Sequence, residues 1–406
     1  MMTTEKKINF GHCLICLGLV CFWFFNFLPS VSAQTSKLRA LPTLKDPASR
    51  GSVEEDDEGR KFISTGASIP MDDGRGYPNG YGYALWKRSG WPWPTTDFKL
   101  AFAVVTGDAE LSLRGLITRD TDLGFGFSYR TLGRFEEYNR GQIDILSRME
   151  THTVAGRWFV HHRIIHNYVE IAQARATYEL GYADYARESE TISSFTLAPS
   201  GIFQTVRLNA GTGKLKRSDY SPKGWAVNLE AEATFRDDWR RWGPPNAWDS
   251  PSSFQKFQMD AAYVASSVYD QKLLAKFGGG VGSGLDRLST FRLGDSLSGR
   301  PDNLVLHGFY THEIFAEDYV LLNLDYIIPL LREQELAFHA YADGAVTTRS
   351  DIPDHSAHVW TGIGAGVSFK GWWETQWVVG YGYGINAQRG NDHGGHEFFT
   401  QMSKQF

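Results

Sequence analysis

Histidines are the residues of this sequence best suited to chemistry. Four of them, His152, His161, His162 and His166, lie in the stretch HTVAGRWFVHHRIIHN. With acids and serines from elsewhere, they could supply a metal site or a hydrolase dyad. In an extended strand, which rises about 3.3 Å per residue, His162 and His166 would lie too far apart to ligate one metal directly. No nucleophile motif accompanies the stretch, so we expect no catalytic residue, metal site or cofactor here.

A second histidine pair lies near the C-terminus. His393 and His396 occur in the stretch DHGGH, again without a nucleophile motif. We interpret both groups as structural histidines and do not expect an enzyme. The segments that contain them are therefore more informative than the histidines themselves.

The N-terminus has the pattern of an export signal. Lys6 and Lys7 precede the apolar run CLICLGLVCFWFFNFL, and the small-residue motif Val31-Ser32-Ala33 follows. This order predicts a secretory signal peptide over residues 1–33. The run is also long enough for an uncleaved membrane anchor, which is the alternative.

Composition excludes several classes of protein. All three cysteines lie before residue 22, so the rest of the chain cannot be a disulfide scaffold or a thiol enzyme. A formal charge of −5 argues against a nucleic-acid partner. The chain has 14% aromatic residues, 42 glycines and 13 tryptophans, but no apolar run after residue 33 is long enough for a membrane helix. This combination favours strands over helices.

Residues 34–60 form an acidic segment with few apolar side chains. We interpret this segment as a flexible lead-in, with a partner-binding acidic patch as the alternative. It is too short for a folded domain, which usually needs about 50 residues or more. We therefore expect residues 61–406 to form the single folded unit.

Strict alternation of apolar and polar residues dominates this unit. In WAVNLEAEATFR, Trp225 to Arg236, apolar residues occupy one parity, and Asn, Glu, Thr and Arg occupy the other. A charged inner face would be costly in the dry core of a β-sandwich. Segments of about 10–15 residues with an apolar outer face instead suit a transmembrane antiparallel β-barrel with a wet lumen.

We count sixteen such segments, an even number as single-chain bacterial barrels require. One of them is expected at 192–210. Short and long connections alternate in the second half, and the longest, 287–318, would be the sixth loop at the outer end. Tryptophans near predicted strand ends are candidates for the two aromatic girdles: Trp86, Trp91, Trp93, Trp239, Trp242, Trp372 and Trp373.

The long loop and the strands after it resemble the surface-antigen superfamily of outer-membrane assembly and translocation barrels, which includes the BamA-like and two-partner secretion transporters. The resemblance covers residues 272–406, and earlier strands match only in general pattern. In that superfamily the sixth loop folds into the lumen, and its Val-Arg-Gly-Phe/Tyr tip contacts an acidic residue on a later strand. Leu306-His307-Gly308-Phe309 stands where the tip would be, and Phe338 to Gly344 (FHAYADG) resembles the acidic strand. The resemblance thus implies that Asp343 is the partner of the tip.

This chain departs from the pattern by having His307 in place of the arginine. A titratable imidazole ring then replaces the permanently charged guanidinium group of arginine. Independently of the resemblance, His339, Tyr341 and Asp343 share one parity of their segment and would point into the lumen. Asp343 could therefore bind the tip or remain a solvated lumen carboxylate.

Alternating glycines mark two consecutive strands on the predicted lumen face. They are Gly362, Gly364 and Gly366 on one strand and Gly380, Gly382 and Gly384 on the next. Missing side chains leave room for another backbone, such as an inserted loop, to approach. The alternative is that these glycines only relieve curvature in a strongly bent sheet.

The last residues, HEFFTQMSKQF, place Phe398, Met402 and Phe406 on one parity. A terminal aromatic strand of this kind resembles the assembly signal of outer-membrane barrels. The resemblance implies bacterial outer-membrane lipid and the barrel assembly machinery as partners, with any client or solute unknown. We expect a structural or protein assembly and translocation role without a periplasmic polypeptide-binding domain. The alternatives are a passive porin-like channel and, third, an outer-membrane hydrolase.

Overall fold

The computed structural model describes fourteen stretches of the chain. They are residues 61–71, 79–103, 106–136, 138–139, 142–166, 170–216, 223–237, 239–244, 251–267, 269–297, 304–331, 335–348, 357–389 and 392–405. The predicted signal peptide and lead-in, residues 1–60, lie outside them, as does Phe406.

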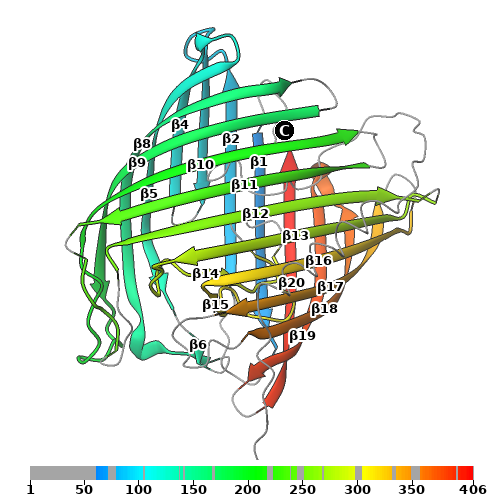
Figure 1. Cartoon of the computed structure of the whole chain (residues 1–406). Coiled ribbons are helices and arrows are strands. Elements are labelled where there is room, and N and C mark those ends of the chain that lie inside the picture. Colours follow the sequence, from blue (N-terminus) through cyan, green and yellow to red (C-terminus); the bar gives the residue numbers. More distant parts are fainter. Residues whose placement is uncertain are drawn as a thin grey trace, which may run out of the picture.

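Sixteen long strands form one closed antiparallel barrel (Figure 1). They are β1 (Lys61–Pro70), β2 (Asn79–Ser89), β3 (Thr96–Ala103), β4 (Thr106–Thr118), β5 (Thr121–Phe135), β8 (Met149–His166), β9 (Glu170–Arg187), β10 (Gly201–Lys216), β11 (Lys223–Arg236), β12 (Ser253–Ser266), β13 (Lys272–Ser283), β16 (Asp318–Pro329), β17 (Leu336–Thr348), β18 (His358–Lys370), β19 (Gln376–Arg389) and β20 (Asp392–Gln405). Two small two-stranded sheets lie in connections between them: β6 (Tyr138–Asn139) with β7 (Gln142–Ile143), and β14 (Phe291–Leu293) with β15 (Ile314–Ala316).

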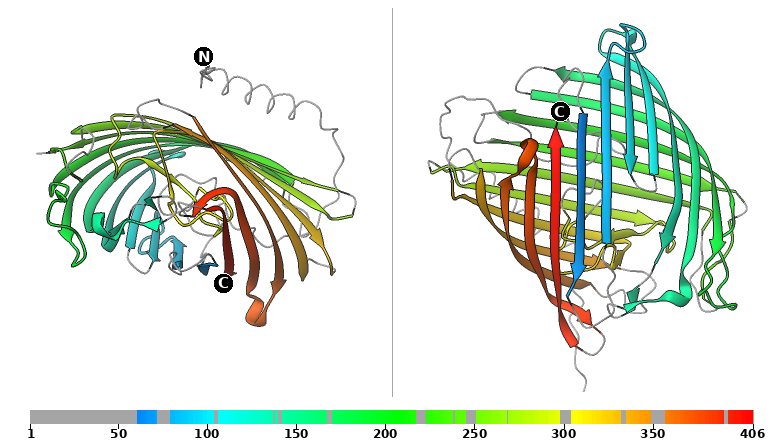
Figure 2. Two further views of the ribbon diagram at one scale, coloured as in Figure 1. Left: turned by 90° about the horizontal axis from the view of Figure 1, so that it is seen from below. Right: turned by 180° about the vertical axis from the view of Figure 1, so that it is seen from behind.

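The ring closes between the first and last strands. β1 pairs with β20 in a continuous register from Phe62 opposite Gln405 to Pro70 opposite Glu397 (Figure 2). Closure leaves no unpaired sheet edge, as a membrane-spanning sheet requires. The predicted sixteen-stranded all-β barrel is confirmed. Among the described residues, no helix is both long and apolar enough to cross a bilayer.

Alternation of side chains sets the two faces of the wall. On β5, Leu123, Phe125, Phe127 and Tyr129 point outward and are exposed. On β10 the outward residues Val206 and Leu208 alternate with buried Thr205 and with Arg207, which pairs with a glutamate of β11. The outer face is therefore apolar and the inner face polar, as expected for strands that separate lipid from a wet lumen.

Buried ion pairs line part of this polar inner face. Glu110 of β4 forms ion pairs with Arg157 of β8 and Arg175 of β9, at N···O distances of 2.9 and 2.7 Å. Arg157 also contacts Asp108. These pairs tie β4, β8 and β9 together across the lumen face.

Strand direction determines where the connections lie. Because consecutive strands alternate in direction, the connections after the odd-numbered strands of the ring share the end opposite the chain termini. The sixth of these is the segment 284–317 between β13 and β16, which carries β14 and β15. The yellow ribbon of this segment passes inside the ring of strands in Figure 2.

The predicted strand at 192–210 is wrong in its first half, because β10 begins only at Gly201. Residues 192–200 are instead a loop whose Phe195 is buried. Arg187 binds the carbonyl oxygens of Ile192 and Phe195, and Pro199 cannot donate a ladder hydrogen bond. The apolar run that suggested a strand is therefore buried by packing among loops.

The predicted girdle is also wrong for two tryptophans. Trp242 is 1% exposed and packs with Phe135, Met149 and Phe195, while Trp239 packs against the same cluster. By contrast, Trp91, Trp93, Trp372 and Trp373 are exposed in turns at the end where the chain termini lie. The sequence could not separate these groups, since tryptophans near strand ends suit both an interface and a loop core.

Candidate functional site: a loop tip held inside the barrel

The sixth outer-end loop folds back on itself before it enters the lumen. β14 pairs with β15, and isolated bridges join Leu293 to Leu304 and Asp295 to Leu306. The folded loop buries Leu293, Leu306 and Phe309, each with 0% exposure, in a core shared with the barrel wall. Apolar burial thus helps to keep the loop inside.

The loop tip meets β17 at Asp343. One carboxylate oxygen of Asp343 accepts the backbone N–H of His307 at 2.8 Å and lies 2.5 Å from its ring atom Nδ1. Asn323 of β16 donates to the other oxygen at 2.7 Å and also to the carbonyl of Val305 at 2.9 Å. Asp343 is therefore a buried acceptor with three hydrogen bonds, two of them from the loop. The two residues that the sequence suggested as partners lie together, in contact.

The His307 ring is also fixed by aromatic neighbours. It stacks on Tyr341 with ring centroids 4.3 Å apart and planes at 15°, and Phe399 of β20 lies at 5.6 Å. Tyr341 in turn stacks near His339 at 5.7 Å. An imidazole can stack on a ring and bond a carboxylate in its own plane at the same time, so histidine fills the arginine position with a shorter side chain.

A hydrogen-bond chain lies beneath this stack. His339 Nδ1 is 3.0 Å from Asp325 Oδ1, and His339 Nε2 is 2.9 Å from Ser368 Oγ. The order acid, imidazole, hydroxyl resembles that of a hydrolase triad. Ser368 is buried inside the wall, however, so its hydroxyl group caps the imidazole and holds it under Tyr341.

Gly308 is held against the backbone of the wall. Its φ of +79° is a left-handed conformation that favours glycine, and an added Cβ would overlap the backbone nitrogen of Gly384. On the wall, Cβ atoms at Gly362, Gly382 and Gly384 would collide with the backbone of His307 or Gly308. These three glycines therefore make room for the inserted loop.

The other three predicted lumen glycines lie beside aromatic side chains. Added Cβ atoms at Gly364 and Gly366 would meet Tyr341, and one at Gly380 would meet Phe399. These are the two rings that flank His307, so the second set of glycines gives space to aromatic side chains rather than to the loop backbone. Added Cβ atoms at Gly364 and Gly366 would also meet backbone oxygens of β19, those of Tyr381 and Val379.

Further contacts, which sequence reasoning missed, hold the tip from its other side. Gly308 N donates to Ser296 Oγ at 3.3 Å, and Ser296 donates to Glu397 of β20 at 2.5 Å. Arg389 of β19 donates to the Gly308 carbonyl at 3.1 Å and to Glu313 at 2.6 Å. Glu397 lies directly before the predicted outward residue Phe398, so strand parity could have marked it as a lumen group.

Phe309 completes the tip. It is fully buried, and its ring meets Trp360 of β18 edge to face, with centroids 5.9 Å apart. His307, Gly308 and Phe309 therefore touch four consecutive strands, β17 to β20. The tip fixes one sector of the barrel wall.

At the C-terminal strand, Phe398 points outward and is 39% exposed, while its neighbours Glu397 and Phe399 point inward and are buried. Met402 lies on the same parity as Phe398 and pairs with Trp377 of β19. Phe406 lies outside the described residues, so the assembly signal stays a prediction.

The histidines of the stretch HTVAGRWFVHHRIIHN do not form one site. His161 contacts Gln173 at 3.1 Å, His162 contacts Thr121 at 2.9 Å, and His152 contacts Thr131 at 3.2 Å. Within the described stretches, no group of three or more histidine, cysteine, aspartate or glutamate side chains is arranged to hold a metal ion.

Comparison with known proteins supports the architecture. No protein-family model matches this chain, and no curated protein matches its sequence. Among solved structures, BamA from Haemophilus ducreyi lacking POTRA domains 1-3 matches with a TM-score of 0.58 and 13% identity, over 90% of this chain and 76% of that one. The fold is that of the BamA and CdiB barrels. CdiB from Escherichia coli matches with a TM-score of 0.57 and 13% identity, over 91% and 68% of the two chains. CdiB from Acinetobacter baumannii matches with a TM-score of 0.55 and 10% identity, over 86% and 60%.

The fold expected from the loop-tip motif is thereby confirmed. At 10–13% identity the likeness concerns the fold alone, and the chain spans only 60–76% of the matched chains. The fold and these neighbours point to the bacterial outer membrane.

Proposed function

We propose that this chain is an outer-membrane barrel with a role in protein assembly or translocation, and that its sixth outer-end loop occupies the lumen in the resting state. The observation that carries the proposal is the loop tip, which is bound to Asp343 inside a sixteen-stranded barrel of the BamA and CdiB fold. Residues 1–33 would direct export, and residues 34–60 would form a flexible lead-in. Outer-membrane lipid and the barrel assembly machinery would be its partners during insertion.

The buried tip argues against a freely open pore. A passive channel needs a continuous aqueous path. The sixth loop is instead packed against the wall inside the lumen through apolar contacts and charged hydrogen bonds. A loop held only by noncovalent contacts can instead be displaced by a client that competes for the lumen. The structure therefore fits a barrel whose lumen is partly filled by the sixth loop.

The test uses site-specific photo-crosslinking in bacterial cells that make the protein. A photoreactive residue replaces Asn228, on the inner parity of β11, and the matched control replaces its outward neighbour Leu229. An assembly or translocation barrel should give polypeptide adducts from the lumen position in actively growing cells. Lumen adducts should disappear when protein synthesis is stopped.

Planar-bilayer conductance is the second measurement. The purified barrel should conduct little, and deletion of residues 304–312 should raise its conductance. A large steady conductance of the intact protein, together with no lumen adducts, would identify a passive channel and overturn the proposal.

A further inference from the structure

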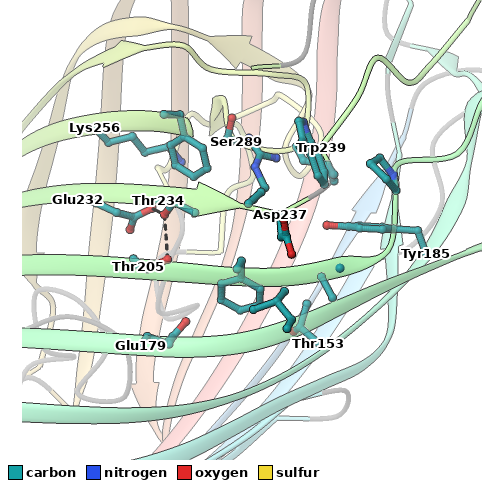
Figure 3. A pocket seen from close by; sticks show the side chains of 18 of the residues that line it. Thr153, Glu179, Tyr185, Thr205, Glu232, Thr234, Asp237, Trp239, Lys256 and Ser289 are labelled. Carbon is teal, nitrogen blue, oxygen red and sulfur yellow. Dashed lines mark hydrogen bonds between the residues drawn. The ribbon is translucent and has the colours of Figure 1, made fainter. Parts of the chain in front are cut away.

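Polar side chains on the lumen wall bond to one another. Around the lumen cavity shown in Figure 3, Glu232 pairs with Arg207 at 2.9 Å, and Thr205 and Thr234 share a hydrogen bond of 2.9 Å. The lipid-facing side of the wall is mostly apolar, but three cations gather on it at the end where the chain termini lie.

These cations lie on adjacent strands across the closure of the ring. Lys61 is the first residue of β1, and Arg88 and Lys404 are the last residues but one of β2 and β20. Figure 2 shows these strands side by side, β20 in red and β1 and β2 in blue. Lys61 and Arg88 are exposed, and Lys404 is partly exposed.

Strand parity places all three side chains on the lipid-facing side. Lys61 has the parity of Ile63, which is 41% exposed and is the direct partner of Lys404 across the ladder. Trp86, on the parity of Arg88, is the direct partner of Lys61. Direct partners share a face of the sheet, so the three cations point outward together.

Lys61 lies between the other two cations. Arg88 and Lys404 are each a diagonal neighbour of Lys61, at a separation of about 7–8 Å that long side chains can span. Among the described residues of β1, β2 and β3, no aspartate or glutamate has the outward parity. Like charges at this spacing repel one another, so an anion placed between them would stabilise this edge of the barrel.

An aromatic cluster lies at the same level. Trp91 of the turn after β2 contacts Trp86 and Phe98, with ring centroids 5.9 and 5.0 Å apart. Trp91 and Trp93 are 38% and 59% exposed. Indole rings favour the headgroup level of a bilayer, which places the three cations at the depth of lipid phosphates.

Apolar surface continues from the cations toward the middle of the wall. Ile63 of β1 and Phe102 of β3 face outward and are 41% and 46% exposed. Leu100, opposite Trp86, lies on the same face. A phospholipid presents a phosphate and then acyl chains in this order, whereas an acidic peptide has no such chains. Charge and continuity with the lipid-facing surface therefore both favour a lipid.

We propose that the edge formed by β20, β1 and β2 binds the phosphate of an anionic phospholipid, with Lys61 at the centre and Arg88 and Lys404 on either side. The guanidinium group of Arg88 can bind two phosphate oxygens at once. The acyl chains lie along Ile63, and the lipid contacts both strands that close the ring. This inference requires a barrel embedded in a membrane, and it does not depend on a role in assembly or translocation.

The acidic run Glu54 to Glu58 is the competing occupant. Only Gly59 and Arg60 separate it from Lys61, so its carboxylates could reach the same cations. An experiment on the lipid must therefore also vary this run.

The test measures which lipid lies beside the cations. In the full chain with its three cysteines replaced by serine, Ile63→Cys carries an NBD fluorophore, and the protein is reconstituted in phosphatidylcholine vesicles. A nitroxide on an acyl chain of either phosphatidylglycerol or phosphatidylcholine quenches the fluorophore on contact. The control reporter is Phe125→Cys on β5, whose direct partners Leu111 and Trp158 are uncharged.

Quenching should show a preference for the anionic lipid at position 63 only. We expect a preference for phosphatidylglycerol of about fivefold or more at this position, and of less than about twofold at position 125. Equal quenching by the two lipids at position 63, or the same preference at both positions, would overturn the proposal.

Charge variants locate the site. Lys61→Gln combined with Arg88→Gln should reduce the preference to below about twofold. Lys87→Gln removes one charge from the lumen parity of the same strand and should leave the preference unchanged. Heat-dependent gel mobility checks that each variant remains folded. An undiminished preference in the double variant would reject the assignment.

Neutralising the acidic run tests the competing occupant. Replacement of residues 54–58 by glutamine and asparagine should leave the preference at position 63 within about twofold of its parent value. A preference that appears only in this variant would assign the cations to the acidic run and overturn the proposal.

Discussion

Substitution of Asp343 by asparagine should release the sixth loop, and the size of the effect follows from three hydrogen bonds. Two donors of His307 point at one carboxylate oxygen, and Asn323 points at the other. A hydrogen bond to a charged acceptor contributes about 1.5–3 kcal/mol and a neutral one about 0.5–1.5 kcal/mol, so neutralising the two loop bonds costs about 2 kcal/mol. Asparagine keeps the size of aspartate, so packing should change little.

A donor conflict adds to this loss. The new amide has one oxygen and one NH₂ group, whereas aspartate offers two acceptors. In either orientation, its NH₂ group faces a donor from His307 or Asn323. Asn323 could turn its own amide, but it would then lose its bond to Val305. A further loss of about 1 kcal/mol brings the total to about 3 kcal/mol, or roughly a 100-fold rise in the displaced population.

Thiol labelling measures that population. Cys13, Cys16 and Cys21 are replaced by serine, and the fully buried Leu306 is replaced by cysteine as a reporter in the loop. When reclosing is fast, the rate of maleimide labelling is proportional to the displaced fraction. Asp343→Asn should therefore label roughly 100-fold faster than the parent protein.

Asp325→Asn is the matched control. It is the same chemical change on the same wall, but Asp325 bonds His339 and not the loop. Its labelling rate should change by less than about threefold, which corresponds to less than one neutral hydrogen bond. Equal labelling rates for the two variants would refute the claim that Asp343 anchors the tip.

Three further predictions concern other parts of the barrel. Gly308→Ala should displace the tip and speed labelling by at least about tenfold, because an alanine in the left-handed conformation costs about 1–2 kcal/mol and its methyl group would also collide with β19. Gly344→Ala is the control and should not change the labelling rate, because an added Cβ there meets nothing within 4 Å. Deletion of Phe406, or Phe406→Asp, should lower the amount of membrane-inserted protein in cell fractions, and normal insertion of both variants would remove the assembly-signal interpretation. Glu110→Gln should lower the unfolding free energy in urea by about 3 kcal/mol, because two buried arginines lose their shared carboxylate, and an unchanged unfolding midpoint would contradict this.

Some features of the site could be predicted from the sequence because they depend on parity. Asp343 and the alternating glycines Gly362 to Gly366 fall on the inner face of any strand that contains them. Glu397, Ser296 and Arg389 were missed, although parity gave the direction of Glu397. Their roles depend on which strand or loop lies opposite, and parity contains no information about that.

The failed prediction at residues 192–200 has a related cause. A short apolar run can be buried by strand pairing or by packing among loops, and alternation does not separate the two. Here the loop segment packs with Trp242, a residue far away in the sequence. The long-range contact decided the local structure.

The sequence by itself determined the alternation of apolar outer and polar inner side chains, and so predicted a transmembrane antiparallel barrel, because a period of two is a local pattern. Only the tertiary structure decided what fills the lumen. The path of residues 284–317 and the contact of His307 with Phe399 join the sixth loop to β20, which is not its neighbour in the chain. Their distances depend on barrel closure, which brings β20 beside β1 and gives the interior its curvature. Local pattern fixes the direction in which a side chain points, whereas closure of the ring fixes what it meets.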